Sequence, residues 1–92
     1  MSSIQKSLTD YLNYLEIEKN RSQKTRENYE HYLKVFLAFA KVKSPEDITE
    51  AIVRDFRVAL ARGQGQKPLK KITQSYYVIA IRNFMKYLAR HD

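Results

Sequence analysis

The sequence predicts an all-α protein. It contains two glycines and two prolines among 92 residues, and these two residue types interrupt helices most strongly. Apolar residues recur at steps of three and four along four segments, which is the period of a helix with one buried face. With 43% hydrophobic residues, a chain of this length suits one compact core. We therefore expect a single domain over residues 1–92.

The first two helices are predicted at about residues 3–19 and 23–40. Ser2 or Ser3 can cap the first helix, and Ser22 stands as an N-cap before the second. The apolar stripe of the first helix consists of Ile4, Leu8, Tyr11, Leu12 and Leu15. That of the second consists of Tyr29, Tyr32, Leu33, Phe36, Leu37 and Ala40. Each stripe predicts one face packed in a core.

The third helix is predicted at about residues 49–61. Ser44 precedes Pro45 and two acidic residues, which is typical of a helix start, so a short helical turn is expected at 45–48. Thr49 offers a second cap before the main helix. The apolar stripe there consists of Ile52, Val53, Phe56 and Leu60.

The fourth helix is predicted at about residues 72–90, after a basic loop. The segment 62–71 holds both glycines, one proline and four positive charges, and is expected to be a flexible loop. The buried side of the helix is predicted to consist of Tyr77, Ala80, Ile81, Phe84, Tyr87 and Leu88. The opposite side carries Ser75, Ile79, Arg82, Lys86 and Arg90.

The net charge of +7 is unevenly distributed. Residues 20–43 hold six basic and two acidic residues, and residues 62–92 hold seven basic and one acidic residue. The remaining two segments, 1–19 and 44–61, are slightly acidic. An excess of this size indicates an anionic partner, although charge alone does not separate DNA, RNA and an anionic membrane.

Several function classes are excluded or disfavoured by residues that are missing. With no cysteine there is no disulfide, thiolate zinc site or cysteine nucleophile. His31 has no second ligand at a suitable spacing, so we expect no bound metal. The sequence also contains no glycine-rich phosphate loop and no catalytic triad, so we expect no cofactor and no catalytic activity. Without a signal-like or membrane-spanning apolar run, we expect a cytoplasmic protein.

Three blocks in this order carry a family resemblance: YLNYLEIEKNRSQKTRENYEHYLKVFLAF, DITEAIVRDFRVAL and TQSYYVIAIRNFMKYL. Within these blocks, two sets of spaced residues carry the resemblance. One set consists of Ser22, Thr25, Tyr29, Leu33, Phe36 and Phe39. The other consists of Thr73, Ile81, Arg82, Phe84, Tyr87 and Leu88. Over about Ile4 to Arg90 the chain resembles the N-terminal core-binding (SAM-like) domain of tyrosine recombinases, including phage integrases and Xer-type enzymes.

The resemblance implies a compact orthogonal bundle of four helices that lies across one face of duplex DNA during recombination and integration. A catalytic domain, expected to be absent from this fragment, would grip the other face in cis, so the fragment itself is not an enzyme. Self-assembly of the full-length protein on DNA is also implied. Most of the seven tyrosines are expected to pack in the core, and none to be the family's nucleophile.

The expected DNA-binding residues lie at the second and fourth helices and in the basic loop. Hydroxyls, amides and cations at helix starts suit phosphate contacts. The set consists of Arg21, Ser22, Lys24, Thr25, Asn28, Lys67, Lys70, Lys71, Thr73, Ser75, Tyr76, Tyr77 and Arg82. Lys86 and Arg90 are left out, because a solvated helix face has the same pattern.

One alternative stays open: a basic helical protein-interaction module in which the charge recruits an acidic partner and tyrosines form hot spots. A helix-turn-helix repressor fits less well, since the join at residues 41–48 is longer than the about three or four residues of that motif. A membrane-surface helix is disfavoured because the apolar stripes are needed to bury one another.

Overall fold

The computed structural model describes residues 3–63 and 69–91 and confirms the all-α prediction. The elements are α1 (Ile4–Ile17), α2 (Gln23–Ala40), the 3-10 turn η1 (Pro45–Asp47), α3 (Glu50–Arg62) and α4 (Lys71–His91). The described residues contain no strand. The largest departure from the predicted bounds is α1, which ends two residues early because Asn20 adopts a left-handed φ of 53° and reverses the chain.

Three helix starts are fixed by hydroxyl caps. Ser3, Ser22 and Thr49 each accept a hydrogen bond from the backbone N–H three residues later, at 3.1 to 3.2 Å. Each cap satisfies one of the amides that a first helical turn leaves without a partner. Ser44 behaves differently from the expected cap, because its hydroxyl donates to the carboxylate of Asp47 at 3.2 Å.

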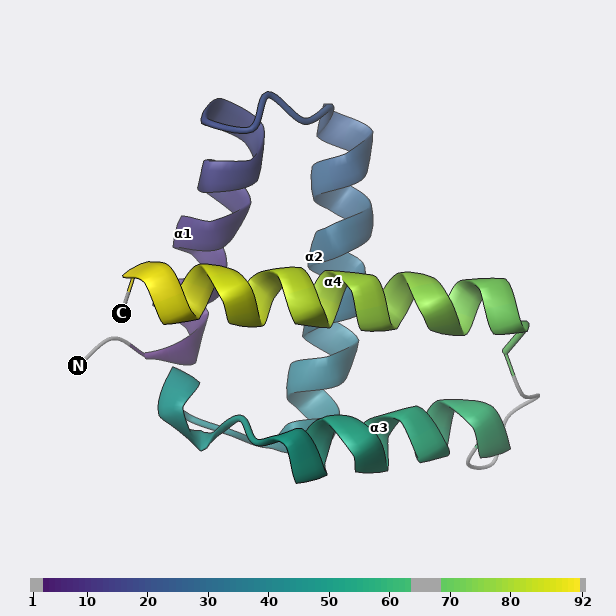
Figure 1. Cartoon of the computed structure of the whole chain (residues 1–92). Helices are drawn as coiled ribbons and strands as arrows, with labels where there is room; N and C mark the ends of the chain where they lie inside the picture. Colours follow the sequence, from purple (N-terminus) through teal and green to yellow (C-terminus); the bar gives the residue numbers. More distant parts are fainter. Residues whose placement is uncertain (1–2, 64–68, 92) are drawn as a thin grey trace.

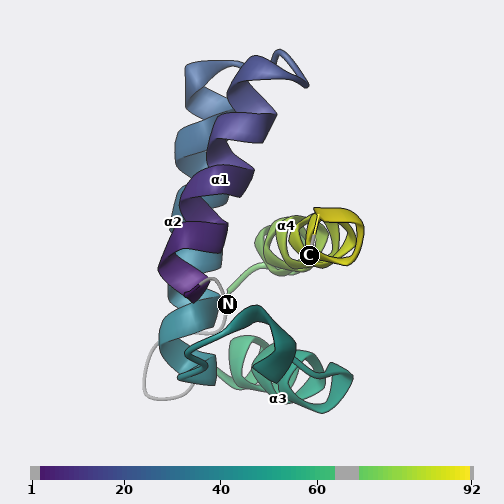
Figure 2. The same ribbon diagram turned by 90° about the vertical axis from the view of Figure 1, so that its left-hand side faces the viewer.

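The helices form two layers (Figures 1 and 2). α1 and α2 lie side by side and run in opposite directions, and α4 crosses over both of them. α3 lies beside α4 in the second layer and also contacts the end of α2. All four helices therefore contribute to a core between the layers.

The core follows the predicted apolar stripes closely. Its buried apolar residues are Ile4, Leu8, Tyr11, Leu12, Leu15, Leu33, Phe36, Leu37, Val53, Phe56, Leu60, Tyr77, Ala80, Ile81, Phe84 and Leu88. Aromatic rings join the layers: the Tyr11 and Phe84 ring centroids are 5.1 Å apart, and those of Phe36 and Phe56 are 5.2 Å apart. The prediction that most tyrosines pack in the core is confirmed, since only Tyr76 is exposed.

Two negative findings concern the described residues. None of the helices there is both long enough and apolar enough to cross a membrane. Across residues 3–63 and 69–91, no group of three or more histidine, cysteine or acidic side chains is arranged to hold a metal ion.

Candidate nucleic-acid interface

α4 forms two corners with the layer of α1 and α2 (Figure 2). One corner is filled by α3, and we call it the α3 corner. The other lies between α4 and the C-terminal half of α1 with the N-terminal half of α2, and no helix of the described residues covers it. We call this second one the open corner. Both the start of α2 and one exposed face of α4 border it.

The start of α2 is a capped helix N-terminus with exposed cations beside it. The Ser22 hydroxyl accepts from the Thr25 amide at 3.1 Å and also donates to the Thr25 hydroxyl oxygen at 3.0 Å. The helix dipole places partial positive charge at this end, where Arg21 and Lys24 are exposed. Asn28 follows one turn later and is exposed on the same segment. The structure therefore brings these five predicted residues together.

A groove joins the start of α2 to α4 within the open corner. It is lined by Thr25, Asn28, Tyr29, Tyr32, Tyr76 and Ile79. The rings of Tyr32 and Tyr76 stack with centroids 6.5 Å apart, and Tyr76 keeps 46% of its surface exposed. Tyr76, predicted from the α4 start, thus belongs spatially with the predicted residues of α2.

Tyr77 lies on the buried side of α4. It is 7% exposed, its ring centroid lies 4.7 Å from that of Tyr32, and its hydroxyl is 3.3 Å from Nε2 of His31. Burial raises the pKa of this phenol above its ordinary value, so it stays protonated at neutral pH. Its ring is occupied by core packing, and its hydroxyl faces His31.

The remaining residues predicted at the α4 start form a second group. Lys71 and Ser75 line a groove with Arg57 of α3, on the side of α4 away from the start of α2. The Ser75 hydroxyl donates to the Lys71 carbonyl at 3.1 Å. Lys70 is exposed and Thr73 is half-buried. Lys67 lies outside the residues that the structure describes.

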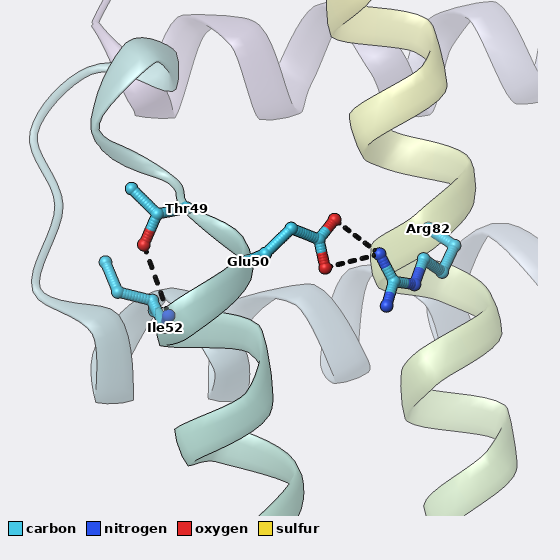
Figure 3. Close-up of polar contacts among 4 residues, drawn as sticks. All are labelled: Thr49, Glu50, Ile52 and Arg82. Carbon is cyan, nitrogen blue, oxygen red and sulfur yellow. Dashed lines mark hydrogen bonds and ion pairs between the residues drawn. The ribbon is translucent and has the colours of Figure 1, made fainter.

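Arg82 is already paired within the protein (Figure 3). Its Nη1 donates to both carboxylate oxygens of Glu50, at 2.9 and 2.6 Å, which joins α4 to the first turn of α3. The neighbouring Thr49 caps that turn. The charge of Arg82 is therefore largely neutralised by Glu50, unlike that of Arg21 or Lys24.

Sequence reasoning missed one face of α4. Tyr76, Ile79, Asn83, Lys86 and Arg90 follow each other at steps of three and four and line the open corner. Lys86 and Arg90 were instead expected on one face with Ser75 and Arg82. Counting from Tyr76 at helical spacing would have separated the two faces.

Comparison with known proteins identifies relatives along the whole chain. The family described as phage integrase, N-terminal SAM-like domain, matches residues 8–92. The tyrosine recombinase XerC of Bacillus subtilis (strain 168) is 33% identical over 90 residues, covering 98% of this chain and 29% of the relative. XerC of Bacillus pumilus (strain SAFR-032) is 32% identical over 92 residues, covering 100% and 30%.

A third relative comes from a different genus. XerC of Leptospira interrogans (serovar Lai, strain 56601) is 33% identical over 90 residues, again 98% of this chain and 29% of the relative. The chain thus spans less than a third of the length of these relatives. No solved structure matches it significantly. From its sequence match and its four-helix fold, the chain belongs to the phage integrase N-terminal SAM-like domain family, the N-terminal domain of tyrosine recombinases.

Proposed function

We propose that the chain is the DNA-binding domain of a site-specific tyrosine recombinase and holds duplex DNA in its open corner, near the crossover site. A catalytic domain in cis would cleave and join strands during recombination or integration, and the full-length protein would assemble on DNA. The 92 residues themselves act as one core-binding domain without a catalytic role. This proposal places the protein in the cytoplasm, with access to DNA.

The observation that carries the proposal is the state of the cations at the open corner. No acidic side chain of the described residues lies within 4.0 Å of Arg21 or Lys24. Arg26 and Lys34, on the same helix, each form an ion pair at 3.0 Å. Arg21 and Lys24 thus lie beside the exposed end of α2 without an acidic partner among the described residues, and phosphates can replace water there.

The proposed contacts divide by chemistry. Phosphate oxygens accept from the first-turn amides of α2, from Arg21 and Lys24, and from the Thr25 hydroxyl, which Ser22 orients by donating to its oxygen. Asn28 and Tyr76, in the groove between α2 and α4, reach the base edges or sugars. The second group at the α4 start consists of Lys67, Lys70, Lys71, Thr73 and Ser75, and it would contact the flanking backbone. Tyr77 and Arg82 support the interface from within the protein.

Salt dependence of DNA binding tests the proposal. We expect the anisotropy of a labelled duplex to give a slope of log K against log salt near −0.9 per neutralised phosphate, for about four to six phosphates. Lys24→Gln should make the slope less negative by about 0.9. Lys34→Gln is the matched control on α2, and it should leave the slope unchanged. Binding that is insensitive to salt would contradict the proposal.

An exposed apolar strip favours the protein-interaction alternative. Ile72, Tyr76 and Ile79 are 57%, 46% and 48% exposed and follow each other along α4. Apolar side chains in such a row suit a protein partner as well as nucleotide bases. Tyr76→Ala distinguishes the two functions: it should weaken duplex binding if DNA is the partner and leave it unchanged if a protein is.

A further inference from the structure

A second pocket lies in the open corner, where the end of α1, the start of α2 and the C-terminal half of α4 meet. Its lining includes the cations Lys19, Arg21, Lys86 and Arg90, together with Tyr11 and Asn83. Tyr29 lines both this pocket and the groove described above. Apart from Arg21, none of the lining cations belongs to the interface predicted from sequence.

The charges around this pocket are unbalanced. Within residues 3–63 and 69–91, no acidic side chain lies within 4.0 Å of any of the four cations. The Lys19 ammonium lies 5.8 Å from the ring centroid of Tyr14, and Lys86 and Arg90 are one helical turn apart. Like charges gathered around one pocket repel one another, so an anion bound among them is stabilised by all four.

The floor of the pocket carries a polar group with no partner. Tyr11 is 1% exposed, and its hydroxyl is buried without any hydrogen bond. Burial is the main cause that raises the pKa of Tyr11. The neighbouring phenols of Tyr29 and Tyr14 raise it further, and Arg21 lowers it. All three neighbours also line the pocket, so the hydroxyl lies close to it. It keeps its proton at neutral pH and is a donor that lacks an acceptor.

The backbone holds the two loop cations in place. The Arg21 amide donates to the Leu15 carbonyl at 3.0 Å, and the Lys19 amide donates to the Tyr14 carbonyl at 3.1 Å. Asn20, between them, takes the left-handed conformation that lets the chain turn. The loop is therefore ordered without a ligand, which lowers the entropic cost of binding one.

We propose that this pocket is a phosphate-binding site. Its donors come from α1, from the loop after α1 and from α4, so they match the several oxygens of a phosphate better than the two coplanar oxygens of a carboxylate. The Tyr11 hydroxyl and the guanidinium groups donate to the oxygens, and the ammonium groups add charge. On DNA the ligand is one phosphodiester of the backbone, and this identification rests on the proposed function. Free phosphate would bind to the same donors by the same chemistry.

Titration with inorganic phosphate tests the pocket without DNA. At constant ionic strength, phosphate should cause saturable amide shifts at residues 19–21 and 86–90, and chloride should not. Tyr11→Phe and the double variant Lys86→Gln/Arg90→Gln should each weaken phosphate binding at least severalfold, while Lys34→Gln leaves it unchanged. Circular dichroism checks that each variant is folded. Equal shifts with chloride, or unchanged affinity in Tyr11→Phe and the double variant, overturn the proposal.

Duplex binding by the same variants distinguishes the two sources of phosphate. If a DNA phosphate fills the pocket, Lys86→Gln/Arg90→Gln makes the salt slope less negative by about 0.9. If phosphate titrates the pocket but the slope is unchanged, the pocket serves free phosphate. If Lys24→Gln changes the salt slope of duplex binding but inorganic phosphate causes no amide shifts, the phosphate pocket is ruled out and the proposed function stands. Without salt-dependent duplex binding, the proposed function fails, and the phosphate titration alone decides on the pocket.

Discussion

The two corners beside α4 are built from opposite chemistry. In the α3 corner, Phe56 packs against Phe36, Phe39 and Tyr77 with ring centroids 5.2 to 5.9 Å apart. One cation of α4 that faces α3, Arg82, is paired with Glu50, whereas Lys71 lines a groove with Arg57 at the other end of α3. The open corner instead gathers Arg21, Lys86 and Arg90 with no acidic partner among the described residues.

This difference separates stability from binding. Burial of apolar rings stabilises the fold, whereas unpaired like charges around an open surface oppose it slightly. The α3 corner therefore secures α4 against the other helices, and the open corner is free to serve a ligand. Substitutions in the two corners should affect different measurements.

The largest expected effect is the loss of a ring in the α3 corner. Phe56→Ala should lower the free energy of unfolding by about 3–5 kcal/mol, because it leaves a cavity among buried rings. Tyr76→Ala in the open corner should lower it by under about 1 kcal/mol, since Tyr76 is half exposed. Urea unfolding measures both. Similar losses for the two variants would remove the distinction between the corners.

The caps Ser22 of α2 and Thr49 of α3 give a matched pair of variants. Ser22→Ala and Thr49→Ala each remove a cap bond, at 3.1 and 3.2 Å, and should each lower stability by about 1 kcal/mol. Only Ser22 borders the open corner, so only Ser22→Ala should also weaken duplex binding beyond its effect on folding. Duplex anisotropy at a temperature where both variants are folded makes the comparison. Equal weakening by Thr49→Ala would place DNA on α3 as well.

Two buried tyrosines should respond differently to loss of the hydroxyl. Tyr77→Phe removes the contact with His31 and should lower stability by about 1 kcal/mol. Tyr11→Phe removes a donor without a partner and should leave stability unchanged or raise it by up to about 1 kcal/mol. Thermal unfolding at neutral pH without phosphate measures both. A clear loss in Tyr11→Phe would mean that its hydroxyl has a partner in the free protein.

Alkaline pH gives a second readout for Tyr11. Burial raises the pKa of this phenol above its usual value of 10.0, so above that pH the unfolded chain releases the proton before the folded one does. Stability contributed by the protonated form is present below about pH 10 and is lost as the pH rises. Tyr11→Phe should therefore flatten the fall in unfolding free energy above pH 10. An unchanged fall would contradict the burial of this hydroxyl.

The smallest expected effect is at the ion pair. Glu50→Gln should lower stability by under about 1 kcal/mol, because Arg82 and Glu50 side chains are 43% and 66% exposed and water screens the pair. Its salt slope for duplex binding should stay unchanged if Arg82 lies away from the DNA. A slope more negative by about 0.9 would show that the freed Arg82 reaches a phosphate.

The helices and their buried faces could be predicted from the sequence, because periodicity and capping are local. Ser22 and Thr49 mark the starts of α2 and α3 directly. The open corner could not be predicted from the sequence, because it depends on where α3 lies. α3 covers one side of α4 and engages Arg82, which leaves the side with Lys86 uncovered.

Two residues illustrate the limit in the candidate interface. Tyr76 and Tyr77 are neighbours in sequence, but consecutive helical residues point in different directions, so one lines the groove and the other is buried. Charge counts found the segments that hold the excess, yet they could not tell Arg26, paired with Glu16, from Lys24. Pairing requires the distances between helices.

Mapping the duplex by NMR tests the central claim most directly. On titration with duplex DNA, amide shifts should concentrate at residues 21–32 of the α2 start, along the face of α4 from Tyr76 to Arg90, and more weakly at residues 70–75. Residues 50–56 of α3 should stay unshifted, because they fill the other corner away from Lys71 and Ser75. Shifts confined to α3, or to α1 away from residues 14–19, would contradict binding in the open corner.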